Sequence, residues 1–190
     1  MTDSDASSGA PKPSIPELLF GFSEPLNVYV VIDAAKIPLL LDILEEHDFE
    51  GACLLPGRLA PDVAAAAPYV ILLEPDSRLC EWLLKEYWRA DAFIALRSEH
   101  ALGPVMKHLR GLTVAKVPDG SRAYFRFYDP RVLRAYLPTC TDEERAIFFG
   151  DVVLSYWVDA GRAVESASAL EFDPGTEPEP VRHLVSSSAG

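Results

Sequence analysis

Cysteine, histidine and basic residues are scarce in this chain. Its 190 residues include 3 cysteines and 4 histidines, and 17 Lys and Arg stand against 29 Asp and Glu. Cys53, Cys80 and Cys140 form no Cys-x-x-Cys pair, which excludes a zinc knuckle of the usual spacing and gives no disulfide framework. Cysteine usage of this kind favours a reducing compartment.

Long apolar runs are also missing. None approaches the ~20 residues of a membrane-spanning helix. The first ten residues are polar and acidic, whereas a secretory signal has a basic start and an apolar stretch. We therefore expect a cytoplasmic protein with no membrane association. The net charge of −12 is spread along the chain, and because an acidic body repels the phosphate backbone, we expect no nucleic-acid binding.

The common catalytic and cofactor-binding motifs are absent. The sequence has no Walker-type phosphate loop, no G-x-G-x-x-G, no G-x-S-x-G and no H-E-x-x-H. Its histidines never stand four apart, so no helix presents a local pair of metal ligands. We expect no catalytic residue, no metal, no cofactor and hence no enzyme. The enzymatic alternative is a small hydrolase that assembles Ser98, His100 or His108 only in three dimensions.

The distribution of apolar residues predicts an α/β fold. We predict a disordered arm over 1–24, one domain over 25–160 and a mostly disordered tail over 161–190, because both ends are rich in polar residues and proline. Between them, short apolar runs alternate with helical spacing. This pattern favours a mixed, partly parallel sheet with flanking helices and a C-terminal antiparallel hairpin.

Local patterns predict the individual elements. A strand buried on both faces is expected at 28–32, and further strands at 69–73 and 92–96. Residues 151–158 fit a final strand or a helix. Helices are expected at 37–46, from Asp76 or Ser77 to 87, at 104–110, at 130–137 and from a capping box at Thr141 to 149. A Pro-Asp-Gly-Ser turn predicts an antiparallel hairpin between 112–117 and 122–128.

The helix expected after Ser77 carries three aromatic residues. At helical spacing Trp82 and Tyr87 share one face, which predicts that both pack in the core. Trp88 points away from that face, and it becomes a contact candidate if it is exposed.

The second hairpin strand carries the densest cluster of aromatic and basic residues. Strand alternation places Tyr124, Arg126 and Tyr128 on one face, and Phe125 and Phe127 on the other. Two interpretations remain open. Arg126 either pairs with a carboxylate or with helix-end carbonyls and holds the hairpin in place, or it belongs to a surface that recognises a partner.

Two further segments hold candidate residues. Asp129 and Pro130 form a structural motif, an N-cap followed by proline at the first helical position, and Arg131 next to them is a candidate for partner binding. Tyr156 and Trp157 are candidates as well, because the apolar residues after Gly150 exceed what a small core is expected to cover.

Several segments together resemble one known family. They are Val31-Ile-Asp-Ala-Ala35, Ala67-Pro-Tyr-Val-Ile-Leu72, Lys107-His-Leu-Arg110, Asp119-Gly120 and Phe125-Arg-Phe-Tyr-Asp-Pro-Arg-Val-Leu133. This set resembles the type VI secretion effector chaperones, also called adaptors. The resemblance implies a cytoplasmic, non-enzymatic protein that binds and stabilises one cognate effector, a toxin, and delivers it to the spike protein of the secretion apparatus. An immunity-type inhibitor that neutralises a basic toxin is the alternative for a small acidic domain.

Overall fold

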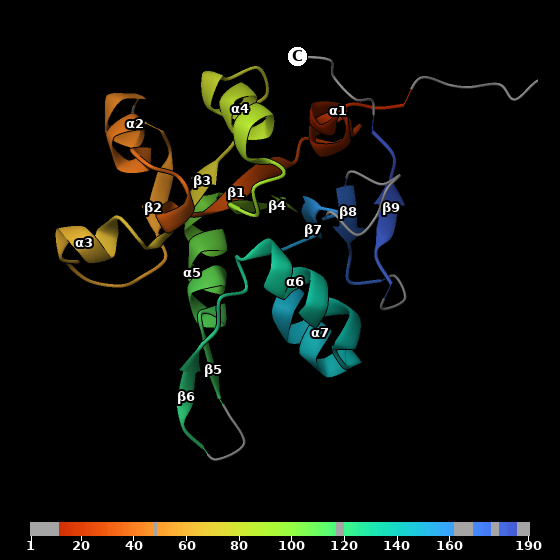
Figure 1. The fold of residues 1–190 in the computed structure, drawn as a ribbon. Helices are drawn as coiled ribbons and strands as arrows, with labels where there is room; N and C mark the ends of the chain where they lie inside the picture. The colour runs from red at the N-terminus through yellow and green to blue at the C-terminus, as the bar shows by residue number, and fades with distance from the viewer. Residues whose placement is uncertain (1–11, 48, 117–119, 162–168, 176–178, 186–190) are drawn as a thin grey trace, which may run out of the picture.

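A seven-stranded sheet forms the centre of the protein (Figure 1). The computed structural model describes residues 12–47, 49–116, 120–161, 169–175 and 179–185. The strands, in the order in which they lie across the sheet, are β2 (Gly51–Cys53), β3 (Pro68–Leu72), β1 (Asn27–Asp33), β4 (Phe93–Ser98), β7 (Ser155–Asp159), β8 (Ala169–Phe172) and β9 (Val181–His183).

All neighbouring strands of this sheet run antiparallel, so the predicted partly parallel arrangement is wrong. β1 and β2 run in the same direction, since both are antiparallel to β3, but β3 lies between them and they are not neighbours. The α/β class itself, with helices flanking a large sheet, is confirmed.

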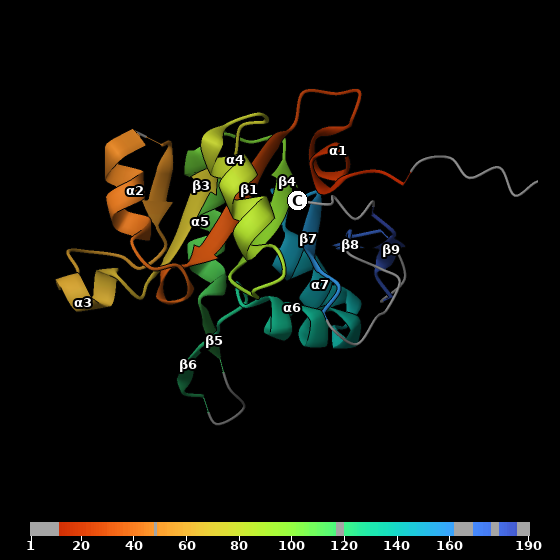
Figure 2. The same ribbon diagram turned by 45° about the horizontal axis from the view of Figure 1, so that its top comes forward.

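Helices cover both faces of the sheet (Figures 1 and 2). One face carries α1 (Ile15–Phe20), α2 (Leu40–His47), α4 (Arg78–Trp82) and the π-helical turn η2 (Leu83–Tyr87). The other face carries α5 (Leu102–Leu112), α6 (Pro130–Tyr136) and α7 (Asp142–Phe149). The short helix α3 (Pro61–Ala64) and the 3-10 turns η1 (Ala34–Lys36) and η3 (Leu137–Thr139) lie in connections. The central strand β1 is therefore buried on both sides, as predicted.

Three predicted helix starts are confirmed. The Ser77 hydroxyl accepts a hydrogen bond from the backbone N–H of Cys80 at 3.1 Å and begins α4. Asp129 caps α6, in which Pro130 takes the first position. Thr141 and Glu144 form the expected capping box of α7. Each cap satisfies backbone N–H groups that have no partner within the helix.

Two helices differ from their predicted bounds. The helix α5 begins at Leu102, before Pro104, and continues past Gly111. Proline is tolerated in the first turn, where its missing N–H would have no partner in any case. The helix α2 begins at Leu40, three residues later than predicted, because residues 34–36 form a 3-10 turn. Within the described part of the chain, no helix is long and apolar enough to cross a membrane.

Both predicted disordered ends contain folded elements, so the predicted domain bounds of 25 and 160 are wrong. Leu19 on α1 is fully buried, and the Arg97 guanidinium on β4 donates hydrogen bonds to the carbonyls of Leu18 and Leu19. At the other end, Phe172 on β8 is buried in the core. The remaining parts of the two ends, 1–11, 162–168, 176–178 and 186–190, lie outside the described residues.

Trp88 is buried against the ring of Phe93, with 5.8 Å between ring centroids, and is not an exposed contact residue. The reason is the π-helical turn Leu83–Tyr87. A π turn contains one residue more than an α-helical turn, so it rotates the residues that follow it relative to regular helical spacing. Trp88 thereby turns onto the sheet, although the spacing within a regular helix placed it on the opposite side.

Candidate functional site

The predicted hairpin exists but forms a separate two-stranded sheet. It consists of β5 (Val114–Lys116) and β6 (Arg122–Tyr124) and extends away from the body beyond α5 (Figure 1). Val114 and Tyr124 are cross-strand partners, and their side chains are 46% and 48% exposed. Two apolar side chains thus remain accessible to solvent on this arm.

The second strand is four residues shorter than predicted. The Phe125 N–H still donates to the carbonyl of Thr113 at 2.9 Å, but the carbonyl of Arg126 accepts from the N–H of Asp129 at 3.0 Å. The latter bond closes a turn that leads into α6. The turn before the Asp129 cap therefore ends the strand. The Arg126 carbonyl accepts the hydrogen bond of the turn and does not pair with a neighbouring strand.

The predicted face of Tyr124, Arg126 and Tyr128 is only partly exposed. Tyr128 is buried, and its hydroxyl lies 3.4 Å from that of Tyr124. Phe127 is fully buried, and Phe125 packs against Tyr136 with 4.9 Å between ring centroids. Of the predicted recognition face, Tyr124 and Arg126 therefore remain available to a partner.

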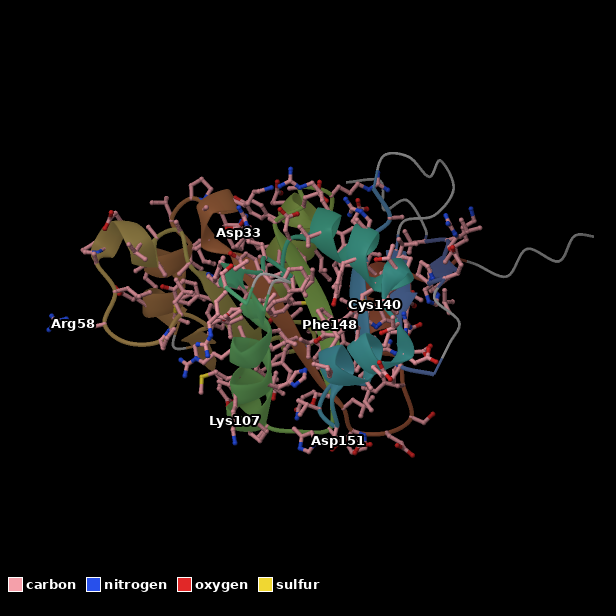
Figure 3. The ribbon with its side chains drawn as sticks, turned by 90° about the horizontal axis from the view of Figure 1, so that it is seen from below. Asp33, Arg58, Lys107, Cys140, Phe148 and Asp151 are labelled. Atoms are coloured by element: carbon pink, nitrogen blue, oxygen red, sulfur yellow. The ribbon has the colours of Figure 1, made fainter. Side chains whose placement is uncertain are left out.

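Arg126 joins two motifs that are 93 residues apart in the sequence. Its Nη2 donates to Oδ2 of Asp33 at 2.5 Å and lies 3.9 Å from Oδ2 of Asp129. Asp33 is buried at the end of β1, and Figure 3 shows it at the end of the sheet opposite to Lys107 and Asp151. This contact agrees with the structural interpretation of Arg126, since a buried carboxylate needs a partner.

Asp129 is the second buried carboxylate of this cluster. Its Oδ1 accepts from the backbone N–H and from Nε of Arg131, at 3.0 and 2.9 Å, and its Oδ2 accepts from Nη2 at 2.6 Å. Burial favours the neutral acid, but these hydrogen bonds outweigh it and hold the pKa of Asp129 below its usual value. The same bonds raise the pKa of Arg131 further above its normal range. Arg131 thus remains 58% exposed while one edge of its guanidinium is fixed.

Acid is expected to weaken the fold through Asp129. Because its folded pKa is depressed, its contribution to stability is complete above its ordinary value of 3.8 and is lost as the pH falls through the folded pKa. At pH 7 we expect Asp129→Asn to cost about 1–3 kcal/mol, since Asn still caps a helix but gives up charge-assisted hydrogen bonds. Urea denaturation of both proteins at pH 7 and at successively lower pH values below 3.8 measures the difference. An equal loss at every pH would contradict this assignment.

Further charged groups lie at the same end of the sheet. Nη2 of Arg134 donates to Oδ1 of Asp91 at 2.7 Å, and Nη1 donates to the carbonyl of Asp159 at 2.8 Å. Burial raises the pKa of Asp159 above its usual value. The sequence left open whether Arg126 pairs with a carboxylate, with helix-end carbonyls or with a partner, and neither Asp33 nor the Arg134–Asp91 pair was predicted. These partners are remote in sequence and meet only because the ends of β1 and β7 lie at the same side of the sheet as the start of β4.

An open groove borders this charged cluster. Its volume is about 560 Å³, and its lining consists of Phe125, Asp129, Arg131, Val132, Ala135 and Tyr136. Burial raises the pKa of Tyr136 to about 12, so its phenol is neutral at physiological pH. The groove therefore combines an apolar floor with the charges of Asp129 and Arg131. We refer to it below as the α6 groove.

Comparison with family models gives one match. Residues 28–146 match the model described as a domain of unknown function, DUF4123. The chain belongs to the DUF4123 family. The matched part of this DUF4123 protein contains Asp33, Arg126, Asp129, Arg131 and the α6 groove, whereas β7, β8 and β9 follow it. No curated protein matches the chain, and no solved structure does.

Tyr156 and Trp157 of this DUF4123 protein are core residues, so the prediction that they form an exposed contact surface is wrong. Tyr156 is fully buried and Trp157 is 2% exposed. They point to opposite faces of β7, and helices cover both faces. The sequence prediction treated everything after 160 as a tail, but β8 returns and pairs with β7. An interior strand has two buried faces, which explains the unexpected amount of apolar surface.

The residues of the hydrolase alternative do not form a catalytic arrangement. The Ser98 hydroxyl donates to the carbonyl of Val152 at 2.6 Å. The Nε2 atoms of His100 and His108 each lie 2.9 Å from a backbone carbonyl, those of Asp151 and Phe148. A hydrolytic serine needs a histidine base on its hydroxyl. No such pair exists among these three side chains.

Cys53, Cys80 and Cys140 are all free thiols. Burial raises the pKa of Cys80 to about 11, which keeps it a thiol and therefore a poor nucleophile. Among the residues for which coordinates are described, no group of three or more His, Cys, Asp and Glu side chains is arranged to hold a metal ion.

Proposed function

We propose that this DUF4123 protein is a non-enzymatic chaperone, or adaptor, that binds and stabilises a cognate type VI secretion effector and promotes its loading onto the spike protein. The observation that carries the proposal is the accessible apolar surface on the projecting hairpin, formed by Val114 and Tyr124. Accessible apolar side chains on a projecting arm are available for contact with another protein, and the α6 groove begins at the next residue, Phe125.

The family context supports the same function. DUF4123 is a family known in type VI secretion effector-associated contexts. The motifs through which the sequence resembles the effector chaperones include Asp33, Arg126 and Asp129, and these three side chains meet in one cluster. The cluster fixes the base of the hairpin to the end of β1. We infer that the motif holds the binding arm in position, which is a structural role and requires no catalysis.

The proposal places the protein in the cytoplasm, where an effector is synthesised and requires protection before export. Free thiols are compatible with a reducing compartment. The acidic surface, with a net charge of −12, disfavours nucleic acid as a partner and favours proteins that carry basic regions.

Affinity purification of the tagged full-length chain, from cells of its source that express the neighbouring genes, tests the proposal. We expect a large toxin-like protein to co-purify in stoichiometric amount, with or without a spike protein, and to be identified by mass spectrometry. Recovery of the chain alone under these conditions would contradict the chaperone function.

The acidic charge also suits the alternative, an immunity-type inhibitor that neutralises a basic toxin through charge complementarity. The same purified complex separates the two functions. A chaperone leaves the toxin domain free, so the toxin in the complex should retain its activity. Inhibition of the toxin in proportion to the amount of bound chain would instead identify an immunity protein.

A further inference from the structure

The α6 groove has an apolar floor that is held rigidly. Phe125 packs edge-on against Tyr136, and both rings contact the core residue Phe148, with centroid distances of 6.5 and 5.8 Å. Ala135 is an exposed residue of α6, and its small side chain leaves the groove open. A volume of about 560 Å³ lies within the usual range for ligand sites, which is large enough for two or three side chains.

One guanidinium group, that of Arg131, lines the groove, and a second, that of Arg126, has its Nη2 atom 3.9 Å from Oδ2 of the lining residue Asp129. The side chains of Arg126 and Arg131 are 46% and 58% exposed, although each is anchored to a buried aspartate. Arg131 uses Nε and Nη2 for Asp129, and Arg126 uses Nη2 for Asp33. Among the residues with described positions, the Nη1 atom of neither arginine has a hydrogen-bond partner. Anchored guanidinium groups lose little entropy on binding and prefer carboxylates as partners.

We propose that the α6 groove binds a segment of the effector in which one or two large apolar side chains stand next to an Asp or Glu. The apolar side chains would lie on Phe125, Val132 and Tyr136, and the carboxylate would pair with Arg131. This inference rests on the proposed chaperone function and names the surface and the chemistry of its partner.

Charge complementarity favours an acidic segment as the occupant of the α6 groove. The chain as a whole carries a charge of −12, so most of its surface attracts basic segments, but among the residues that line the groove the exposed charge is that of Arg131. Asp129 itself is buried behind Arg131. A second copy docked through the same groove around a two-fold axis would bring the Arg131 side chains of the two copies toward each other, which opposes self-association.

A peptide selection tests the groove directly. A library of random 12-residue peptides displayed on phage is selected on the full-length chain, and the enriched peptides are synthesised. We expect them to combine Asp or Glu with Leu or an aromatic residue. Their affinity, measured by fluorescence anisotropy, should fall at least tenfold for Ala135→Glu, which places a negative charge and extra volume in the groove. Ala146→Glu on α7 is the matched control, because Ala146 is an exposed helical alanine outside the groove lining.

Three results would overturn the inference: no enrichment of peptides, enrichment of basic peptides, or equal binding to wild type and Ala135→Glu. A change in the oligomeric state of Ala135→Glu, seen by light scattering, would assign the groove to a second copy of the chain and would also overturn it.

The recovered effector distinguishes this inference from the proposed function. If the effector binds wild type and Ala146→Glu but binds Ala135→Glu at least tenfold more weakly, the α6 groove is its binding site. If it binds Ala135→Glu as tightly as wild type, the groove assignment fails and the chaperone function stands. If no effector is recovered while acidic peptides still bind the groove, the chaperone function fails and the groove remains a peptide-binding site.

Discussion

Trp157→Ser is expected to lower the free energy of unfolding by about 3–5 kcal/mol, the usual cost of truncating a large buried aromatic side chain. The Cζ atom of Arg97 lies over the Trp157 ring, 4.5 Å from the ring centroid. The His183 ring stacks on the Trp157 ring with 4.8 Å between the two ring centroids. The Trp157 Nε1 donates to the Ser155 hydroxyl at 2.8 Å. The substitution therefore removes the side-chain contacts of Trp157 with Arg97 on β4 and with His183 on β9. Thermal denaturation should show a melting temperature lower by about 10 °C.

Leu154→Ser serves as the control for this variant. Leu154 lies three positions earlier and is 40% exposed, so its truncation is expected to cost less than about 1 kcal/mol. At temperatures where Trp157→Ser is folded, capture of the effector should equal that of wild type. A variant that melts like wild type but loses its partner would show that Trp157 is a contact residue and that its burial has been misassigned.

Arg126→Ala is expected to lower the free energy of unfolding by about 2–3 kcal/mol. The substitution leaves the buried carboxylate of Asp33 without its ion-pair partner, and the loss of one member of a buried pair is costly. The expected cost is below that of a fully buried pair, because Arg126 is half exposed and water can reach the vacated position. Urea denaturation monitored by circular dichroism measures the change.

A double-mutant cycle with Asp33→Asn shows whether the ion pair is the cause. The double variant should be more stable than the sum of the two single effects predicts, because the unpaired charge is then absent. Arg122→Ala on β6 is the matched control, since Arg122 is exposed and has no ion-pair partner among the described residues. Additive effects of Arg126→Ala and Asp33→Asn would contradict the assigned role of the pair.

The caps of α4, α6 and α7 and the central strand β1 follow from local sequence. A cap depends on residues within four positions of one another, as with Thr141 and Glu144, so its signal is complete in a short segment. The prediction of α/β class is equally local, because it rests on the period of the apolar pattern. Strand neighbours and their direction, by contrast, depend on where β3 inserts, which no local pattern records.

The candidate site also contains some features that local sequence predicts and others that it does not. Sequence reasoning selected Tyr124, Arg126 and Arg131, and the structure places all three at exposed positions around the base of the hairpin. It did not indicate the α6 groove, because a groove depends on how Phe125 and α6 pack on α7. It also misplaced Trp157, since the burial of β7 depends on the later strand β8.

By itself, the sequence determined the α/β class, the positions of the caps, the hairpin, the selection of Arg126 and Arg131 as candidate residues, and the resemblance to the effector chaperones. Only the tertiary structure decided which carboxylates those arginines bind, that all strands of the main sheet are antiparallel, and that Tyr156 and Trp157 are core residues. The physical reason is the separation along the sequence between the residues that interact. Caps and periodicity arise from contacts within a few residues, whereas ion pairs such as Asp33–Arg126 and the burial of a strand arise from segments that only the complete sheet brings together.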